Sequence, residues 1–175
     1  MSSICPTITA YSPEEYMEQM SRVTGFANRI HIDFMDGMFA PTTSVTVHEA
    51  WWPKSVRADL HVMHKNPMNV LKDILAHRSH TVIVHAEARH VSSFVYELHE
   101  RRIKVGIALL PETPVEELHH FINVIDHVLV FSGKLGYHGG TADLSLLEKV
   151  RSIKAMRPGT KRANRLEQFL LAMLF

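Results

Sequence analysis

One stretch of the sequence, residues 29–41, combines side chains that bind metals and move protons with the pattern of a β-strand. In an extended strand successive side chains point to opposite faces, so His31, Asp33 and Met35 share one face while apolar residues occupy the other. An Asp-Gly turn signal follows directly. The polar residues therefore end a strand that leads into a loop, which is where parallel α/β folds place their active sites.

A third candidate metal ligand is His61, which lies on the next predicted strand. Neighbouring strands lie about 4.8 Å apart, so His61 can meet His31 and Asp33 if the two strands pair. Two imidazoles and a carboxylate suit Zn²⁺, Fe²⁺ or Mn²⁺, with open positions for substrate oxygens. The alternative is that each histidine is an ordinary polar residue at a strand end. The residues alone leave both interpretations open.

The elements that must position these residues follow a regular rhythm. Apolar and β-branched segments predict six strands, and capping residues and helical spacing predict helices between most of them. Such alternation predicts a parallel sheet with helices outside, but a closed barrel needs eight units and usually ~250 residues. The predicted strands are residues 4–9, 29–34, 56–63, 81–86, 104–109 and 127–131; the predicted helices are about 13–23, 66–77, 91–101 and 143–156, with another after the caps at 111–114.

The end of the sequence departs from this rhythm. A seventh strand is due after residue 159, but residues 160–175 carry their apolar residues at helical spacing. We therefore predict a barrel-type domain at residues 1–157 and a helical tail at 158–175.

Composition narrows the function classes. The 175 residues form one domain, and 19 basic against 18 acidic side chains give a net charge of +1, which selects neither nucleic acid nor membrane as partner. The single Cys5 allows no internal disulfide. The chain shows no signal peptide pattern and no apolar run approaching the ~20 residues of a membrane span. We therefore expect a cytoplasmic protein.

Two further groups have open roles. The glycines of residues 133–140 could let backbone N–H groups cradle a phosphate, or could form only a flexible turn. His85 and Glu87, at the end of the fourth predicted strand, could support the metal ligands, but ordinary polar residues are the favoured interpretation.

Taken together, five motifs resemble the ribulose-phosphate 3-epimerase family. The most specific is the His-x-Asp-x-Met-Asp-Gly pattern, and order and spacing agree from residue 4 to about residue 157. The motifs are residues 4–10, 31–37, 59–63 with Asn66-Pro67, 104–109 with 113–116, and 136–140.

The resemblance implies a (β/α)₈ TIM-barrel type of fold, truncated here to about six β/α units plus a C-terminal helix. It also implies interconversion of D-ribulose 5-phosphate and D-xylulose 5-phosphate, in the pentose phosphate pathway, by metal-assisted proton transfer at C3. His31, Asp33 and His61 would bind the metal, and Asp33 would also be an acid/base residue. The implied substrate-contacting residues are Thr7 (or Thr9), Met35, Met63, Gly136, Gly139 and Gly140.

The family's second acid/base residue is an Asp on strand seven, and no counterpart is recognisable in residues 158–175. The alternative function is therefore a non-catalytic remnant that binds sugar phosphate or metal, or that serves as an interaction partner. The partners expected are a sugar phosphate and a second copy of the chain, with no nucleic acid and no membrane.

Overall fold

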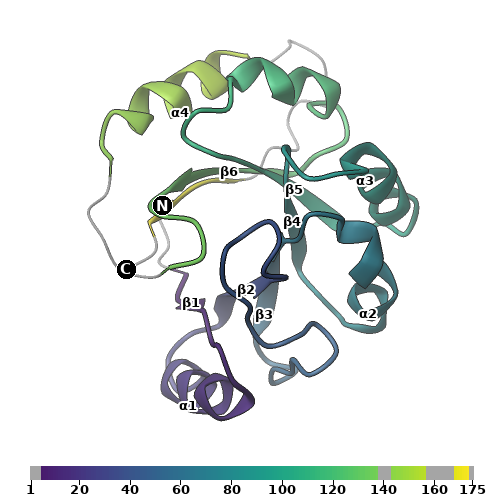
Figure 1. Ribbon diagram of the computed structural model, residues 1–175, viewed down its shortest axis with the longest axis vertical. Helices are drawn as coiled ribbons and strands as arrows, with labels where there is room; N and C mark the ends of the chain where they lie inside the picture. The colour runs from purple at the N-terminus through teal and green to yellow at the C-terminus, as the bar shows by residue number, and fades with distance from the viewer. Residues whose placement is uncertain (1–4, 138–142, 157–167, 174–175) are drawn as a thin grey trace.

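The protein is built on one parallel β-sheet whose seven strands follow chain order. The computed structural model describes residues 5–137 and 143–156, and the backbone of 168–173. In Figure 1 the sheet curls, with the helices along its outer side. Within the described residues no ladder joins β7 to β1, so the curl stays open. The strands are β1 (Thr7–Ile8), β2 (Arg29–Met35), β3 (Arg57–Met63), β4 (Thr81–His85), β5 (Lys104–Leu109), β6 (His127–Ser132) and β7 (Gln168–Met173).

The first helix begins where its capping residues predict it. Ser12 accepts a hydrogen bond from the Glu15 N–H, and Pro13 opens α1 (Pro13–Val23). The segment predicted at 66–77 divides into a 3₁₀ turn and a short α-helix, and the one after 111–114 is a 3₁₀ helix. The remaining elements are η1 (Pro67–Val70), α2 (Leu71–Ala76), α3 (Val91–Glu100), η2 (Val115–His120) and α4 (Leu146–Ala155).

The two faces of the sheet differ in chemistry. Ile30, Ile32 and Phe34 of β2 are fully buried in the large apolar core, to which α3 contributes residues at helical spacing, among them Phe94 and Leu98. The alternate residues of β2 and β3 face the inside of the curl and are mostly polar. The predicted truncated TIM-barrel type of fold is thus confirmed as a curled parallel half-barrel.

The helix predicted at residues 160–175 is wrong for the part that the structure describes. Residues 168–173 form β7, which pairs in parallel with β6 from His127↔Gln168 to Ser132↔Met173. A short apolar run fits either structure by periodicity alone. The free edge of β6 offers a row of backbone donors and acceptors, which a strand can satisfy. Residues 157–167 and 174–175 lie outside the described residues, and the predicted domain boundary at 157 stays a prediction.

Candidate active site

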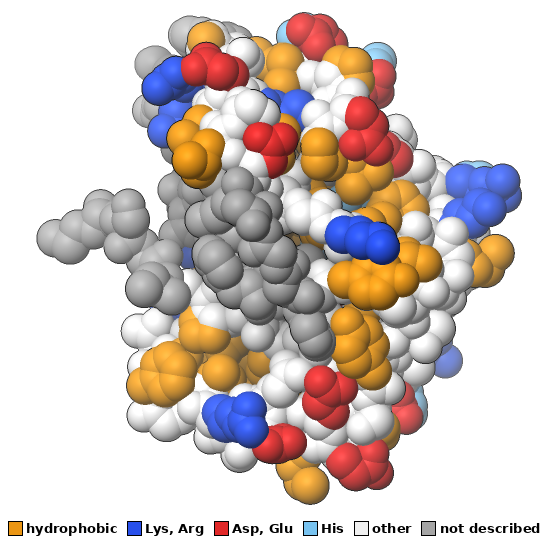
Figure 2. All heavy atoms as spheres, turned by 60° about the vertical axis from the view of Figure 1, so that its left-hand side comes forward, with side chains coloured by type: hydrophobic (Ala, Val, Ile, Leu, Met, Phe, Trp, Pro, Cys, Tyr) orange, Lys and Arg blue, Asp and Glu red, His pale blue; other side chains and the backbone are white. Residues whose placement is uncertain are grey.

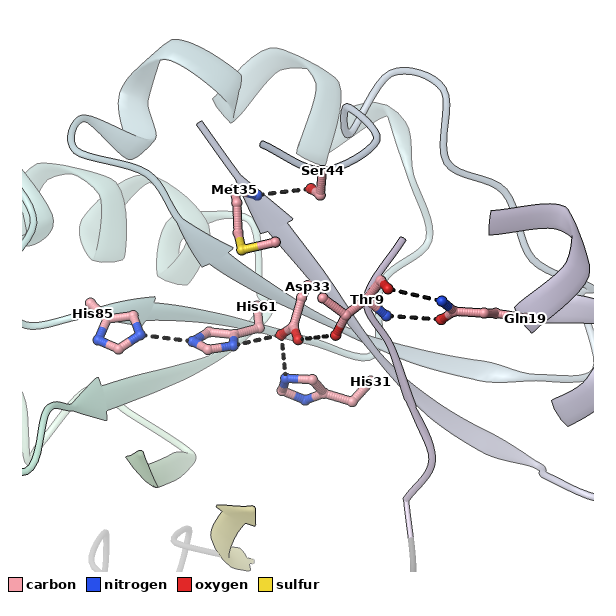
Figure 3. A network of polar contacts seen from close by, with 8 residues as sticks. All are labelled: Thr9, Gln19, His31, Asp33, Met35, Ser44, His61 and His85. Carbon is pink, nitrogen blue, oxygen red and sulfur yellow. Dashed lines mark hydrogen bonds and ion pairs between the residues drawn. The ribbon is translucent and has the colours of Figure 1, made fainter. Parts of the chain in front are cut away.

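The three predicted metal ligands converge at one point inside the curl. β2 and β3 pair so that Asp33 lies directly beside His61, and His31 stands two residues earlier on the same face. His61 Nδ1 lies 2.9 Å from Asp33 Oδ1, and His31 Nε2 lies 3.3 Å from the same oxygen. All three side chains are buried, and one ligand atom of each lies within 4.8 Å of the others. Figure 3 shows the three side chains pointing toward one another from the two strands.

The second oxygen of Asp33 is held from β1. The Thr9 hydroxyl donates to Asp33 Oδ2 at 2.6 Å. The Thr9 backbone is fixed in turn by the Gln19 side chain, which accepts from its N–H at 3.1 Å and donates to its carbonyl at 2.9 Å (Figure 3). Of the two candidate threonines, Thr9 therefore touches the cluster, whereas Thr7 is exposed and pairs with His31 lower on the strand.

The protonation states suit ligands. Burial by itself raises the pKa of Asp33, but the contacts with His31 and His61 outweigh burial and hold this pKa well below its usual range. Burial lowers the pKa of His61 to about 4, against the opposing pull of Asp33. At neutral pH the site thus presents an ionised carboxylate and a neutral imidazole, the forms in which these groups bind metals.

The site fits a divalent transition metal. Neither ring nitrogen of the buried His31 makes a hydrogen bond within the described residues, although buried polar atoms are nearly always satisfied. Two imidazoles and one carboxylate form a donor set suited to Zn²⁺, Fe²⁺ or Mn²⁺. A cation bound to this cluster would satisfy the His31 nitrogen that faces Asp33.

Apolar side chains close the site toward the carboxyl ends of the strands. Met35 and Met63 pair across β2 and β3, are buried, and pack with Ala40 and the partly buried Leu135. Phe131 of β6 contacts the His61 ring, with centroids 6.4 Å apart. These neighbours give the cluster a low-dielectric wall, in which charge interactions strengthen.

The loop after β6 docks on the loop after β2. The Thr42 hydroxyl donates to the Gly136 carbonyl at 2.6 Å. Gly136 has a φ of +83°, and an added Cβ would lie 2.7 Å from Pro41 Cδ, so only glycine fits without strain. Gly139 and Gly140 lie outside the described residues, so the predicted phosphate cradle stays a prediction.

His85 also lies against the cluster. Its Nε2 lies 3.0 Å from His61 Nε2, and its ring packs against that of His61 with centroids 5.0 Å apart. The available signal was alternation along β4, which puts Thr81, Ile83 and His85 on the inner face beside β3. His85 therefore contacts the cluster, and its support of the metal ligands stays a prediction.

Comparisons with known proteins agree with this geometry. The family model of the ribulose-phosphate 3 epimerase family matches residues 3–167. The ribulose-phosphate 3-epimerase of Bacillus subtilis (strain 168) is 32% identical over 136 residues, which cover 75% of this chain and 63% of the relative. That of Rhodospirillum rubrum is 34% identical over 144 residues, covering 79% and 62%.

The ribulose-phosphate 3-epimerase of Treponema pallidum (strain Nichols) is 31% identical over 135 residues, which cover 75% of this chain and 62% of the relative. The alignments thus span about three-fifths of the length of these curated relatives. Because the family match covers nearly the whole chain and includes the strands that bring His31, Asp33 and His61 together, the chain belongs to the ribulose-phosphate 3-epimerase family.

Proposed function

We propose that the chain is a ribulose-phosphate 3-epimerase-like isomerase, which interconverts D-ribulose 5-phosphate and D-xylulose 5-phosphate by proton transfer at C3. The observation that carries this proposal is the buried cluster of His31, Asp33 and His61 on two adjacent strands. It occurs in a chain whose curated relatives are named ribulose-phosphate 3-epimerase.

Asp33 is the proposed base. Its low pKa keeps it ionised at neutral pH, and the Thr9 hydroxyl fixes one of its oxygens. The proton on a carbon next to a carbonyl is too weakly acidic for a carboxylate alone. A divalent cation held by His31, Asp33 and His61 would stabilise the negative charge that develops on the substrate oxygens. Asp33 then takes the C3 proton from its own side of the substrate.

Other residues would place the substrate. Met35 and Met63 form an apolar wall beside the cluster, which suits the uncharged reacting carbon. We propose that the loop containing Gly136, Gly139 and Gly140 holds the phosphate, supported by the clasp between Thr42 and Gly136. Thr9 is a better placed substrate contact than Thr7, because its hydroxyl already lies beside Asp33.

Inversion at C3 also requires an acid on the opposite side. The strand at the seventh position, β7, reads Gln-Phe-Leu-Leu-Ala-Met and contains no carboxylate. We therefore expect this chain to epimerise slowly, with water as the proton source on that side. Losing a positioned acid/base group typically costs about 10²–10⁴ in rate.

A chimera tests this proposal. Residues 158–175 are replaced by the corresponding and following residues of the Bacillus subtilis relative, and both proteins are assayed for xylulose 5-phosphate with Zn²⁺, Fe²⁺ or Mn²⁺. The chimera should have a kcat/KM about 10²–10⁴ higher. Equal kcat/KM values would contradict the impairment, and a folded, metal-loaded chimera without activity would contradict the isomerase.

The second candidate is the non-catalytic remnant, which is favoured by the absence of a carboxylate from β7. Such a protein binds a metal or sugar phosphate, or serves as an interaction partner, without turnover. Titration calorimetry with Zn²⁺ and ribulose 5-phosphate separates the two, because the remnant shows binding while xylulose 5-phosphate stays at the level of a protein-free blank.

Partners and location are also proposals. The open edge of the sheet favours self-association with a second copy of the chain. Deletion of residues 160–175 should therefore change the mass of the protein measured in solution.

The single Cys5 suits a reducing compartment such as the cytoplasm. On the face drawn in Figure 2, basic side chains alternate with acidic and hydrophobic ones. Among the described residues, no helix is long and apolar enough to cross a membrane.

A further inference from the structure

A chain of polar contacts continues from the cluster to the far side of β4. His61 Nε2 meets His85 Nε2 at 3.0 Å (Figure 3), and His85 Nδ1 lies 3.3 Å from Glu87 Oε2. The other carboxylate oxygen of Glu87 accepts from the Leu110 N–H at 2.9 Å and from the Thr113 hydroxyl. Asp33 and Glu87 thus stand at opposite ends of a line that contains two buried imidazoles.

This line of contacts has one proton fewer than it needs for a hydrogen bond at every contact. Each of its three contacts needs one proton to be a hydrogen bond, and the two terminal carboxylates only accept. Two neutral imidazoles supply two protons. One contact must therefore remain without a proton unless one ring takes up a charge inside the protein, or unless a cation replaces the missing proton.

A cation in the cluster decides which contact goes without a proton, because a nitrogen that binds a metal is unprotonated and His61 Nδ1 is the nitrogen that faces Asp33. His85 Nδ1 makes no aligned hydrogen bond within the described residues, and Glu87 Oε2 is the acceptor at ion-pair distance. If His85 carries its proton on Nδ1, its Nε2 is a lone pair that accepts from His61 Nε2–H. His61 Nδ1 is then unprotonated, 2.9 Å from Asp33 Oδ1, and the two lone pairs face one another. Only a cation makes that arrangement favourable.

We propose that Glu87, acting through His85, is a positioning residue that holds His61 in the tautomer with an unprotonated Nδ1, and thereby prepares the cluster for a divalent cation. This proposal rests on the metal site of the proposed function. Partners beyond the direct ligands orient metal-binding histidines in this way and affect affinity strongly. Here the orienting group is a carboxylate two imidazoles away from the metal.

The variant Glu87→Gln tests the proposal with little change in shape. The Gln oxygen can keep the Leu110 and Thr113 hydrogen bonds, which turns its NH₂ group toward His85. His85 must then accept on Nδ1 and donate from Nε2, which moves the His61 proton to Nδ1 and blocks the cluster. We expect Zn²⁺ affinity, measured by competition with a chelator, to fall about 10–100-fold. The matched control Glu97→Gln removes a surface carboxylate on α3 and should leave the affinity unchanged.

A spectroscopic readout separates positioning from loss of structure. In the Zn²⁺-loaded native chain, long-range ¹H–¹⁵N spectra of labelled histidines should show His85 protonated on Nδ1 and His61 on Nε2. Protonation of His85 on Nε2 in that complex, or equal Zn²⁺ affinity in native and folded Glu87→Gln proteins, would overturn the proposal. If Glu87→Gln does not fold, Thr113→Val decides in its place, since it removes one donor to Glu87 and should weaken binding to a smaller extent.

The outcome also distinguishes this proposal from the one on which it rests. If the folded native chain binds Zn²⁺ no better than its His31→Ala variant, the metal site itself is wrong. If His31→Ala abolishes binding and Glu87→Gln leaves it intact, the site stands and only the positioning role of Glu87 is refuted.

Discussion

The inner faces of β2 and β3 carry charged and polar side chains at both ends, but the two ends are built differently. At the amino end, Arg29 donates to Asp59 Oδ2 at 2.7 Å, so a buried carboxylate meets a permanent cation. At the carboxyl end, Asp33 meets only imidazoles and a hydroxyl. The first arrangement balances the charge of the carboxylate within the chain, although the other oxygen, Asp59 Oδ1, makes no hydrogen bond among the described residues. The second leaves lone pairs that a cation from outside the chain can use.

The two ends also differ in which changes they tolerate. A buried ion pair is fixed, and removing one partner leaves an uncompensated charge. At the carboxyl end, the Thr9 hydroxyl and the two imidazoles already contact Asp33 and compensate part of its charge when no cation is bound. We therefore expect changes at the carboxyl end to affect binding and activity, and changes at the amino end to affect stability.

The largest expected effect is at Asp33. Asp33→Asn removes the negative charge and the proposed base while keeping the shape of the side chain. We expect Zn²⁺ affinity to fall about 100-fold or more and any epimerase activity to fall about 10²–10⁴-fold. Chelator competition and a xylulose 5-phosphate assay measure the two effects. A variant that retains native affinity would refute the role of Asp33 as a ligand.

Arg29→Met should have the opposite profile. Met keeps much of the buried stem but leaves Asp59, whose side chain is only 2% exposed, without its cation. We expect the free energy of unfolding in urea to fall by about 3–5 kcal/mol, because breaking one partner of a buried pair has that cost. The control Arg22→Met, in an exposed pair with Glu18, should change stability little. A strong loss of Zn²⁺ affinity in folded Arg29→Met would break the distinction between the two ends.

The third prediction concerns pH and the amino end. His127 is buried, and burial lowers its pKa to about 4, against the attraction of Asp59. As the pH falls, His127 of the unfolded chain therefore becomes protonated near pH 6.5, whereas His127 of the folded chain becomes protonated only near pH 4. Stability from this group is present above pH 6.5 and is lost as the pH falls toward 4.

At pH 5 this linkage lowers the free energy of unfolding by about 1–2 kcal/mol relative to pH 7. His127→Leu should remove the part of this pH dependence that His127 causes. The part caused by His61 should remain, because burial lowers the pKa of His61 as well. Urea melts at pH 5 and pH 7 measure it. Identical pH dependence in both proteins would mean that His127 is not held neutral by the fold.

Much of this organisation could be predicted from local sequence. Alternation along β2 puts His31 and Asp33 on one face, because side chains of a strand change face with a period of two. His61 has the same facing on the next strand in the chain, so pairing of consecutive strands brings it beside them. What escaped prediction depends on register. Thr7 and Thr9 share a face, and only the pairing of Thr7 with His31 brings Thr9 to the level of Asp33.

The other misses depend on partners far away in sequence. Alternation along β4 puts His85 on the inner face, but its contact with the His61 nitrogen depends on the register between β3 and β4, which the pattern does not give. The apolar residues of the tail fit helical spacing, which predicts a helix there. Its strand form at 168–173 depends on the unpaired edge of β6, about 35–45 residues earlier in the chain.

The smallest expected effect is at the loop that approaches the carboxyl end from β6. Gly136→Ala places a Cβ 2.7 Å from Pro41 Cδ and 2.9 Å from Thr42 Oγ1, at a backbone φ of +83° that alanine rarely adopts. We expect a loss of about 1–2 kcal/mol in unfolding free energy. The control Gly25→Ala, where an added Cβ meets nothing within 4 Å, should be neutral or slightly stabilising.

Gly136→Ala should also have a functional consequence. The substitution displaces the carbonyl that the Thr42 hydroxyl holds, but it touches neither His31 nor Asp33. If this loop binds the phosphate, KM for ribulose 5-phosphate, measured in the chimera, should rise while Zn²⁺ affinity stays native. A fall in Zn²⁺ affinity with unchanged KM would instead assign the loop to the metal cluster, and would make the wall formed by Leu135, Met35 and Met63 the connection between them.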